Sequence, residues 1–455
     1  MNKMNNRQSI LSPLRNGKKE IISFGDRLLL PLFFLWMLSI PFSRYSLSGT
    51  VSLDNFLAML LPFTAFFLRP PAGFQALRGW VVCLIWTGFC CLVFAAGWTL
   101  NFFTSLDILY QRAMLLLKLL VYFFIPILYL RNHHAFRQVK GVLILLTIIA
   151  GFSTFLAALG WIQLPVDRFE SSRLGLEWLP KAIGLFSSYG DVAMLYGVTA
   201  VLLVSHERAA LPWQLGRPLV KLGIWLVLLL GLIGNQSRNV LLTTLVALAS
   251  YGLIRSLESS KQPKSRQLWI GLSLATILLL IGLLVAFGQE AVSGISHLGG
   301  KGAAGTAEGR AQSYRQAIGL IAREPWLGIS IDTYLQWRQL ADFMHNMWLK
   351  IMLNGGFMSL LAMLGLLWGA LRGLFGTGRK PSLEFQRDRA LLASLLFSLV
   401  FAAEFYGGMT QVWWILLAVV FSFGWLRWQY DQGENPGRNA VDVGEFEAVT
   451  GERNG

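Results

Sequence analysis

Charged residues are scarce in this chain of 455 residues: Asp, Glu, Lys and Arg make up only 14% of it, whereas globular domains contain about 25%. Hydrophobic residues make up 55%, and the mean hydropathy is +0.54. This balance excludes an ordinary soluble globular domain. Only three cysteines occur, Cys83, Cys90 and Cys91, and all fall in one apolar run. We therefore expect neither a disulfide framework nor a cysteine metal site.

Apolar runs of roughly 17–25 residues, the length that crosses a bilayer as a helix, recur along the chain. They are too long and continuous for barrel strands, so the sequence predicts an all-α, polytopic integral membrane helical bundle with about twelve transmembrane helices. The predicted spans are Leu28–Phe42, Asn55–Leu68, Trp80–Ala96, Ala113–Leu130, Val142–Ile162, Phe186–Val204, Leu219–Ile233, Asn239–Ile254, Leu268–Phe287, Met347–Leu371, Ala390–Phe405 and Val412–Leu426.

Basic residues outnumber acidic ones, 39 to 24, which gives a formal net charge of +15. Most Lys and Arg residues lie in alternate loops, for example at Lys140, Arg255 and Arg389. This positive-inside pattern predicts that both termini are cytoplasmic. Because the topology of a membrane protein accounts for the excess of basic residues, the net charge does not indicate a nucleic-acid partner. We expect no cleaved signal peptide, because no small-residue cleavage site follows the first apolar run.

The predicted organisation is one transmembrane domain, residues 27–428, between a basic cytoplasmic tail, 1–26, and a polar, disordered cytoplasmic tail, 429–455. Residues 289–346 form one large periplasmic loop. Its first part is glycine-rich. The segment SYRQAIGLIAR then predicts an amphipathic helix with Ser313 as its N-cap, and the segment that begins at Asp332 predicts a second short helix.

Three residues are our candidates for catalysis. Arg238 follows a predicted N-cap at the periplasmic start of a span, where the helix dipole favours an anion. Its guanidinium can form two parallel hydrogen bonds to a phosphate. His345 opens the tenth predicted span beside Asn346, a natural N-cap, and histidine suits proton transfer near neutral pH. Arg310 follows the glycine-rich part of the large loop, which could bring it over the mouth of the bundle.

Structural alternatives stay open for each of these residues. Arg238 could be a snorkelling interfacial arginine, Arg310 a solvated charge, and His345 an interfacial histidine without a role. Asn346, Arg315, Tyr189 and Glu404 are our further candidates for substrate binding, because they lie near the periplasmic ends of spans or in the large loop. No metal-binding motif is present, so we expect no metal and no other cofactor.

The segments QSRN around Arg238, EGR ending at Arg310, and HNMWLKIMLNGG from His345 to Gly356 resemble the O-antigen ligase family of bacterial membrane glycosyltransferases. The resemblance implies an inner-membrane enzyme of lipopolysaccharide biosynthesis. Such an enzyme moves O-antigen polysaccharide from an undecaprenyl-pyrophosphate-linked donor to the lipid A–core acceptor at the periplasmic face. Our mechanistic hypothesis is that Arg238 and Arg310 bind the donor pyrophosphate and that His345 is the base. A direct displacement with one base and no covalent carboxylate would invert the anomeric configuration.

Other functions fit the same sequence. An O-antigen polymerase or a protein O-oligosaccharyltransferase would use the same donor, and Ser359 departs from the residues more common in ligases. From a different class, a lipid-linked glycan flippase or transporter would use charges within spans, and Lys118 and Lys350 are the basic residues placed there. The ligase remains the interpretation that the motifs favour.

Overall fold

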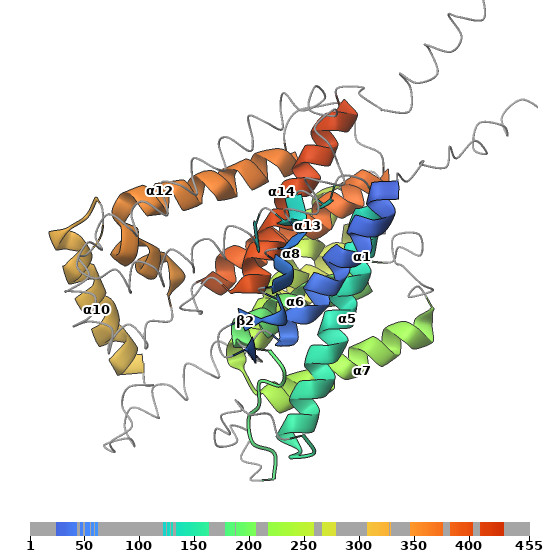
Figure 1. Cartoon of the computed structure of the whole chain (residues 1–455), viewed down its shortest axis with the longest axis horizontal. Helices are drawn as coiled ribbons and strands as arrows, with labels where there is room; N and C mark the ends of the chain where they lie inside the picture. The colour runs from blue at the N-terminus through green and yellow to red at the C-terminus, as the bar shows by residue number, and fades with distance from the viewer. Residues whose placement is uncertain are drawn as a thin grey trace, which may run out of the picture.

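The computed structural model describes residues 24–42, 46–48, 51–54, 56–58, 60–61, 122–123, 125–127, 129–130, 133–162, 178–186, 188–205, 217–258, 266–278, 307–326, 328, 346–375, 383–403 and 410–431. The secondary-structure elements of the described residues are helices, apart from one short antiparallel hairpin of strands β1 and β2 (Figure 1). The elements are α1 (Phe24–Ser39), the 3-10 helix η1 (Ile40–Phe42), β1 (Ser46–Ser48), β2 (Val51–Ser52), α5 (His133–Ala158), α6 (Tyr189–Val204), α7 (Pro218–Asn235), α8 (Arg238–Glu258), α10 (Ala307–Arg323), α12 (Met347–Phe375), α13 (Leu383–Ala403) and α14 (Gln411–Asp431).

Four helical segments are long and apolar enough to cross a membrane: Ala135–Ala158, Pro218–Asn235, Asn239–Glu258 and Gly355–Phe375. Three shorter apolar helices, Leu30–Phe42, Tyr189–Val204 and Gln411–Phe423, also coincide with predicted spans. Helix α13 and the helical residues 266–278 overlap two more. The predicted span Trp80–Ala96 lies outside the described residues, as do most of Asn55–Leu68 and Ala113–Leu130.

Helix α6 is the centre of the bundle. It is buried along almost its whole length and packs against α5, α7, α8, α13 and α14. Helix α7 lies at the edge, and one of its faces exposes Leu219, Leu222 and Leu226. An exposed apolar stripe is costly in water but suits contact with lipid chains, which agrees with a membrane-embedded bundle.

Helices α5 and α7 approach each other closely at small residues, as membrane helices often do. A Cβ added to Gly231 would lie 2.7 Å from the Cα of Gly151 and 1.9 Å from the hydroxyl oxygen of Tyr196. Gly151 in turn contacts Val227, and Gly234 contacts the backbone of Phe155. The contacts advance along both helices together, so α5 and α7 run parallel.

Ion pairs join three helices at one end of the bundle, which we call the ion-pair end. Lys140 of α5 pairs with Asp388 of α13, and both side chains are buried. Arg389 of α13 donates from Nη2 to Glu258 Oε1 of α8 at 2.7 Å, and Arg255 pairs with the same carboxylate at 3.1 Å. The start of α13 therefore meets the end of α8, and these neighbouring helices run antiparallel.

Candidate active site

A small, shallow pocket lies at the opposite end of the bundle, which we call the pocket end; its volume is about 220 Å³ when the open solvent at its mouth is included. Four helices meet there: α6 and α14 begin at the pocket, α12 begins beside it and α13 ends at it. The residues that line it are Gly190, Met194, Met347, Ala402, Ala403, Thr410 and Trp413. The structure thus joins segments that are more than 200 residues apart in the sequence.

Three of the four predicted substrate-binding residues are sequence neighbours of residues that line this pocket, and Arg315 is not. Tyr189 precedes the lining residue Gly190, and Asn346 precedes the lining residue Met347. Glu404 follows the lining residue Ala403 but itself lies outside the described residues. The structure thus places Tyr189 and Asn346 directly beside residues that line one pocket.

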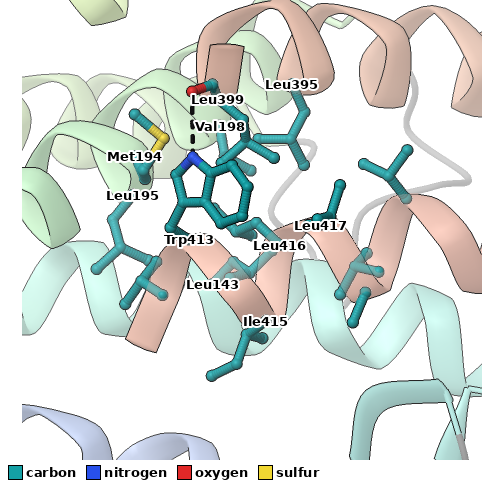
Figure 2. Close-up of a cluster of buried hydrophobic side chains, with 14 of the residues drawn as sticks. Leu143, Met194, Leu195, Val198, Leu395, Leu399, Trp413, Ile415, Leu416 and Leu417 are labelled. Atoms are coloured by element: carbon teal, nitrogen blue, oxygen red, sulfur yellow. Dashed lines mark hydrogen bonds between the residues drawn. The ribbon is translucent and has the colours of Figure 1, made fainter. Parts of the chain in front are cut away.

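Trp413 forms the apolar wall of the pocket. Its indole Nε1 donates a hydrogen bond to the carbonyl oxygen of Leu399 at 3.1 Å, which ties α14 to α13 (Figure 2). Figure 2 shows the ring between side chains of α6, among them Met194 and Val198, and Leu395 of α13. With its polar atom satisfied and its faces packed, this side chain forms a rigid surface.

Two buried carboxylates lie behind the pocket, near the start of α14. Asp191 accepts a hydrogen bond from the backbone N–H of Val412 at 3.1 Å. Asp54 accepts hydrogen bonds from the Tyr122 hydroxyl and from Nε2 of Gln411, the latter at 3.4 Å. The positive end of the α14 dipole favours carboxylates at this position. Asp54 was not selected from the sequence, where its only signal is a charge directly before the predicted span Asn55–Leu68.

Residues 178–186, which we call the strap, connect three helices at the pocket end. Ala182 N donates to Gly234 O at 3.0 Å, and Gln236 Nε2 donates to Leu179 O at 2.8 Å. On the other side, Thr154 Oγ1 of α5 donates to Ile183 O at 2.9 Å. The strap leads directly into α6, so α6 and α8 begin at the same end of the bundle.

The strap buries one charged residue, Lys181, whose ammonium lies 4.0 Å from the ring centroid of Tyr189. Lys181 is not among the candidate residues chosen from the sequence. The signal that could have found it is a single charge within the otherwise apolar segment WLPKAIGLF. A lysine is almost never fully buried unless something compensates its charge, and the ring of Tyr189 is one of the groups that do so here.

The backbone places Arg238 as predicted, at the first position of α8 directly after Ser237. The preceding turn is tight: Gln236 has a φ of 49° and ends α7, and Leu241 N bonds to Ser237 O at 3.2 Å. Arg238 therefore lies at a helix N-terminus on the pocket end, next to the strap. A 21-residue helix presents free N–H groups and positive partial charge there.

The predicted span Met347–Leu371 is not one continuous helix. Helix α12 is broken at Gly355 and Gly356, where Gly356 has a φ of 62°, and the apolar spanning segment begins only at Gly355. Asn346 therefore opens a short helical segment that precedes the span, and Lys350 lies in that segment instead of within the span. The N-cap itself is confirmed, because Leu349 N donates to Asn346 Oδ1 at 2.9 Å.

Helix α10 packs against this short segment, as Figure 1 shows. Ala317 and Ile321 of α10 form a small apolar core with Leu353 of α12. Past the break, the freed N–H group of Phe357 donates to the carbonyl of Pro325 at 2.8 Å. The turn after α10 therefore caps the spanning half of α12.

Helix α10 corrects one prediction and places two others. It begins at Ala307, so Ser313 is a buried residue within the helix and not its N-cap. The predicted start was wrong because helical sequence continues upstream into AEGRAQ, where Arg310 lies in the first turn. Arg315 is exposed on the same helix. His345 lies outside the described residues.

Among the residues that the structure describes, no three His, Cys, Asp or Glu side chains are grouped as ligands for a metal ion. The pocket end instead gathers buried carboxylates, a buried lysine, an aromatic wall and the N-terminus of α8. Of these groups the N-terminus of α8 favours an anion, and Trp413 offers an apolar surface at the pocket.

Residues 223–364 match the family model described as O-antigen ligase. The matched region contains Arg238, Arg310 and His345, and it includes Arg315 and Asn346 as well. Tyr189 and Glu404 lie outside it. No curated protein matches the chain. The family match supports the O-antigen ligase family for this chain.

Proposed function

We propose, for a chain whose residues 223–364 match the O-antigen ligase family, that it transfers O-antigen polysaccharide from undecaprenyl pyrophosphate to lipid A–core. The observation that carries this proposal is that the match contains Arg238, Arg310 and His345, the three candidates for catalysis that the sequence offers. The reaction belongs to lipopolysaccharide biosynthesis at the periplasmic face of the bacterial inner membrane. Both substrates are lipid-anchored, so a site at one end of a membrane bundle fits them.

In the proposed mechanism, an acceptor sugar hydroxyl attacks the anomeric carbon of the donor. The carbon–oxygen bond to the pyrophosphate breaks as the new glycosidic bond forms, and undecaprenyl pyrophosphate leaves. His345 takes the hydroxyl proton as a general base. Arg238 and Arg310 bind the pyrophosphate and stabilise the negative charge that develops on it, the task that a metal ion performs in other transferases. One direct displacement inverts the anomeric configuration.

The geometry of the pocket end supports these roles. Arg238 begins α8 beside the strap, where the helix dipole and the guanidinium both favour a phosphate. Asn346 caps the short segment of α12, which fixes the backbone directly after His345. The packing of α10 on that segment brings the helix that carries Arg310 next to the helix that follows His345.

A strain that lacks the protein distinguishes the competing functions. A ligase predicts lipopolysaccharide without O-antigen, together with accumulated lipid-linked polymer. A polymerase predicts lipopolysaccharide with a single added repeat, and a flippase predicts lipid-linked intermediates trapped on the cytoplasmic side. Glycoproteins that lose their glycan, with normal lipopolysaccharide, would point to a protein O-oligosaccharyltransferase. Gel electrophoresis of lipopolysaccharide shows which form is made, and extraction of the membrane lipids shows which lipid-linked intermediate accumulates.

Complementation of that strain tests the residue roles. His345→Ala is expected to lower ligation about 10²–10⁴-fold, the usual contribution of a general base. Arg238→Lys is expected to lower it about 10–100-fold, because an ammonium lacks the planar fork that binds two phosphate oxygens. Ligation is measured as the ratio of O-antigen-bearing to bare lipopolysaccharide, at matched membrane expression.

Matched controls come from the ion-pair end of the same helical bundle. His133→Ala removes a histidine from the first position of α5, and Arg255→Lys makes the same exchange at the far end of α8. Both controls are expected to ligate normally. Normal ligation by His345→Ala would refute the base, and normal ligation by Arg238→Lys would refute the pyrophosphate role.

A further inference from the structure

Helix α10 leaves one apolar row of its surface exposed. Its buried side, which includes Ala317 and Ile321, packs on Leu353 in the first segment of α12. Next to this side, Ile318 is 55% exposed, and Ala322, one helical turn further on, is exposed as well. Side chains four residues apart share one face of a helix, so these two residues form a continuous apolar row. Figure 1 shows α10 at the outer edge of the described helices.

Trp326 connects the exposed apolar surface of α10 to that of α12. It lies in the turn after α10 and is 66% exposed. Its ring centroid lies 6.1 Å from that of Phe357, and its carbonyl oxygen accepts a hydrogen bond from Met358 N at 3.4 Å. Phe357 and Met358 are also exposed, and they lie near the start of the apolar segment Gly355–Phe375, which is long enough to cross a membrane. The apolar surface of α10 thus leads to the part of α12 that suits contact with lipid chains.

Exposed arginines lie beside the apolar row. Arg315 precedes Ile318 by one helical turn, and Arg323 directly follows Ala322 at the end of the helix. Both arginines are exposed, and α10 as a whole carries three arginines and one glutamate. A helix with an apolar row beside basic residues, and with a tryptophan at one end, is typical of helices that lie at a membrane surface.

We propose that α10 and the turn at Trp326 form a membrane anchor. The anchor lies in the lipid headgroup layer, on the side of the membrane where the spanning half of α12 begins. Ile318 and Trp326 insert among the upper parts of the acyl chains, which removes their apolar surface from water. Arg315 and Arg323 bind the phosphates of anionic phospholipids.

This anchor concerns phospholipids and does not depend on the proposed transfer reaction. It bears on the candidate site because the first turn of α10 carries Arg310, and the buried side of α10 packs on the segment that Asn346 opens. A helix fixed in the headgroup layer keeps both elements at the level of the lipid phosphates.

Photo-crosslinking from the purified full chain in lipid nanodiscs tests the anchor. A benzophenone amino acid replaces either Ile318 of the apolar row or Gln316, a matched control that is also exposed but belongs to the polar side of α10. The nanodiscs contain phosphatidylcholine, with or without about one-third phosphatidylglycerol, and no glycan lipid. Mass spectrometry measures the lipid adducts, and we expect at least about fivefold more adduct from position 318 than from position 316.

The contribution of charge is tested with the photo-crosslinker at position 318. Phosphatidylglycerol is expected to raise the yield of lipid adduct about threefold or more, because basic residues near an anionic surface are attracted to it. The double variant Arg315→Gln/Arg323→Gln should lose this increase. Arg315→Lys/Arg323→Lys, which keeps both charges, should retain it.

Three results would overturn the inference. Equal lipid adduct from positions 316 and 318 would show that the apolar row does not face the membrane. Adducts that form mainly with a second copy of the chain, or with another protein in native membranes, would show that the row is a protein interface. An adduct yield that does not respond to phosphatidylglycerol would refute the role of Arg315 and Arg323. These measurements need no turnover, so a failure of the anchor is distinguishable from a failure of the proposed ligase.

Discussion

At the scale of single residues, polar side chains at the pocket end act on the backbone as well as on any substrate. Asn346 was predicted as an N-cap from its residue type, and its Oδ1 accepts from Leu349 N as a cap should. The helical segment that it opens is short and ends at the break at Gly355. A segment of that length depends on its cap and on packing, because isolated short helices are marginal.

Asn346→Ala is therefore expected to loosen this segment, since loss of an N-cap costs about 1 kcal/mol. Hydrogen exchange should become faster at the amides of residues 347–354 while exchange in α13 is unchanged. Asn346→Asp, which keeps the acceptor oxygen, is the control and should retain the protection of the wild type. Equal exchange in the alanine variant would show that packing against α10, not the cap, holds the segment.

Single residues also show which parts of the candidate site could be predicted from the sequence and which could not. Arg238 and Asn346 were placed correctly because capping chemistry is local. Lys181 and Asp54 were not selected, since their significance comes from burial and from partners that are distant in sequence, such as Gln411 for Asp54. No local pattern encodes such contacts.

At the scale of elements, the strap and the broken helix α12 position the site. The break was not predicted, because Gly355 and Gly356 lie within a long apolar run that resembles one span. Glycine is tolerated in membrane helices when neighbours satisfy the freed backbone groups. The carbonyls of Pro325 and Trp326 do this here for Phe357 and Met358, at 2.8 Å and 3.4 Å. The periodicity of apolar residues in the sequence cannot predict this tertiary contact, so it could not reveal the break.

The strap depends on a glycine at its bend. Gly184 has a φ of 75°, and a Cβ there would lie 2.6 Å from both Ser153 Oγ and Thr154 N of α5. Gly184→Ala is expected to displace the strap and, with it, the turn at Gln236 that leads into Arg238. We expect a rise in donor KM of about threefold to tenfold, with a loss of about 1–3 kcal/mol in stability.

Gly160→Ala separates the two causes. Gly160 has a nearly identical φ of 73°, but nothing lies within 4 Å of an added Cβ. It therefore carries the conformational cost without the clash and should leave the donor KM unchanged. Identical behaviour of the two variants, in donor KM and in thermal unfolding, would argue that the strap does not position a binding residue.

At the scale of the whole molecule, the two ends of the bundle differ in their chemistry. The ion-pair end joins α5, α8 and α13 through Lys140, Asp388, Arg389 and Glu258. Lys140 and Arg389 belong to the basic segments that the charge pattern predicts on the cytoplasmic side of the membrane. Both residues lie at the ion-pair end in the structure. The helical class was predictable from the length of the apolar runs, whereas the central position of α6 was not, because span order does not determine which helices pack together.

Lys140→Met is expected to destabilise the bundle by about 3–5 kcal/mol, because it leaves the buried Asp388 carboxylate without its counter-ion. The double variant Lys140→Met/Asp388→Leu is expected to recover most of this loss, since it removes both charges. Arg137→Met, on the exposed face of α5, serves as the control. Thermal unfolding in detergent measures the differences, and equal stability of Lys140→Met and the control would exclude a structural role for the pair.

Transfer by the purified protein tests the central claim most directly. The measurement reconstitutes the full chain with a defined undecaprenyl-pyrophosphate-linked polysaccharide and purified lipid A–core, and it follows the joined product. The account predicts ligated lipopolysaccharide with an inverted anomeric centre from the wild type and His133→Ala, and almost none from His345→Ala. Product with a retained configuration, equal product from His345→Ala, or no product from an intact wild type that binds both lipids would contradict it.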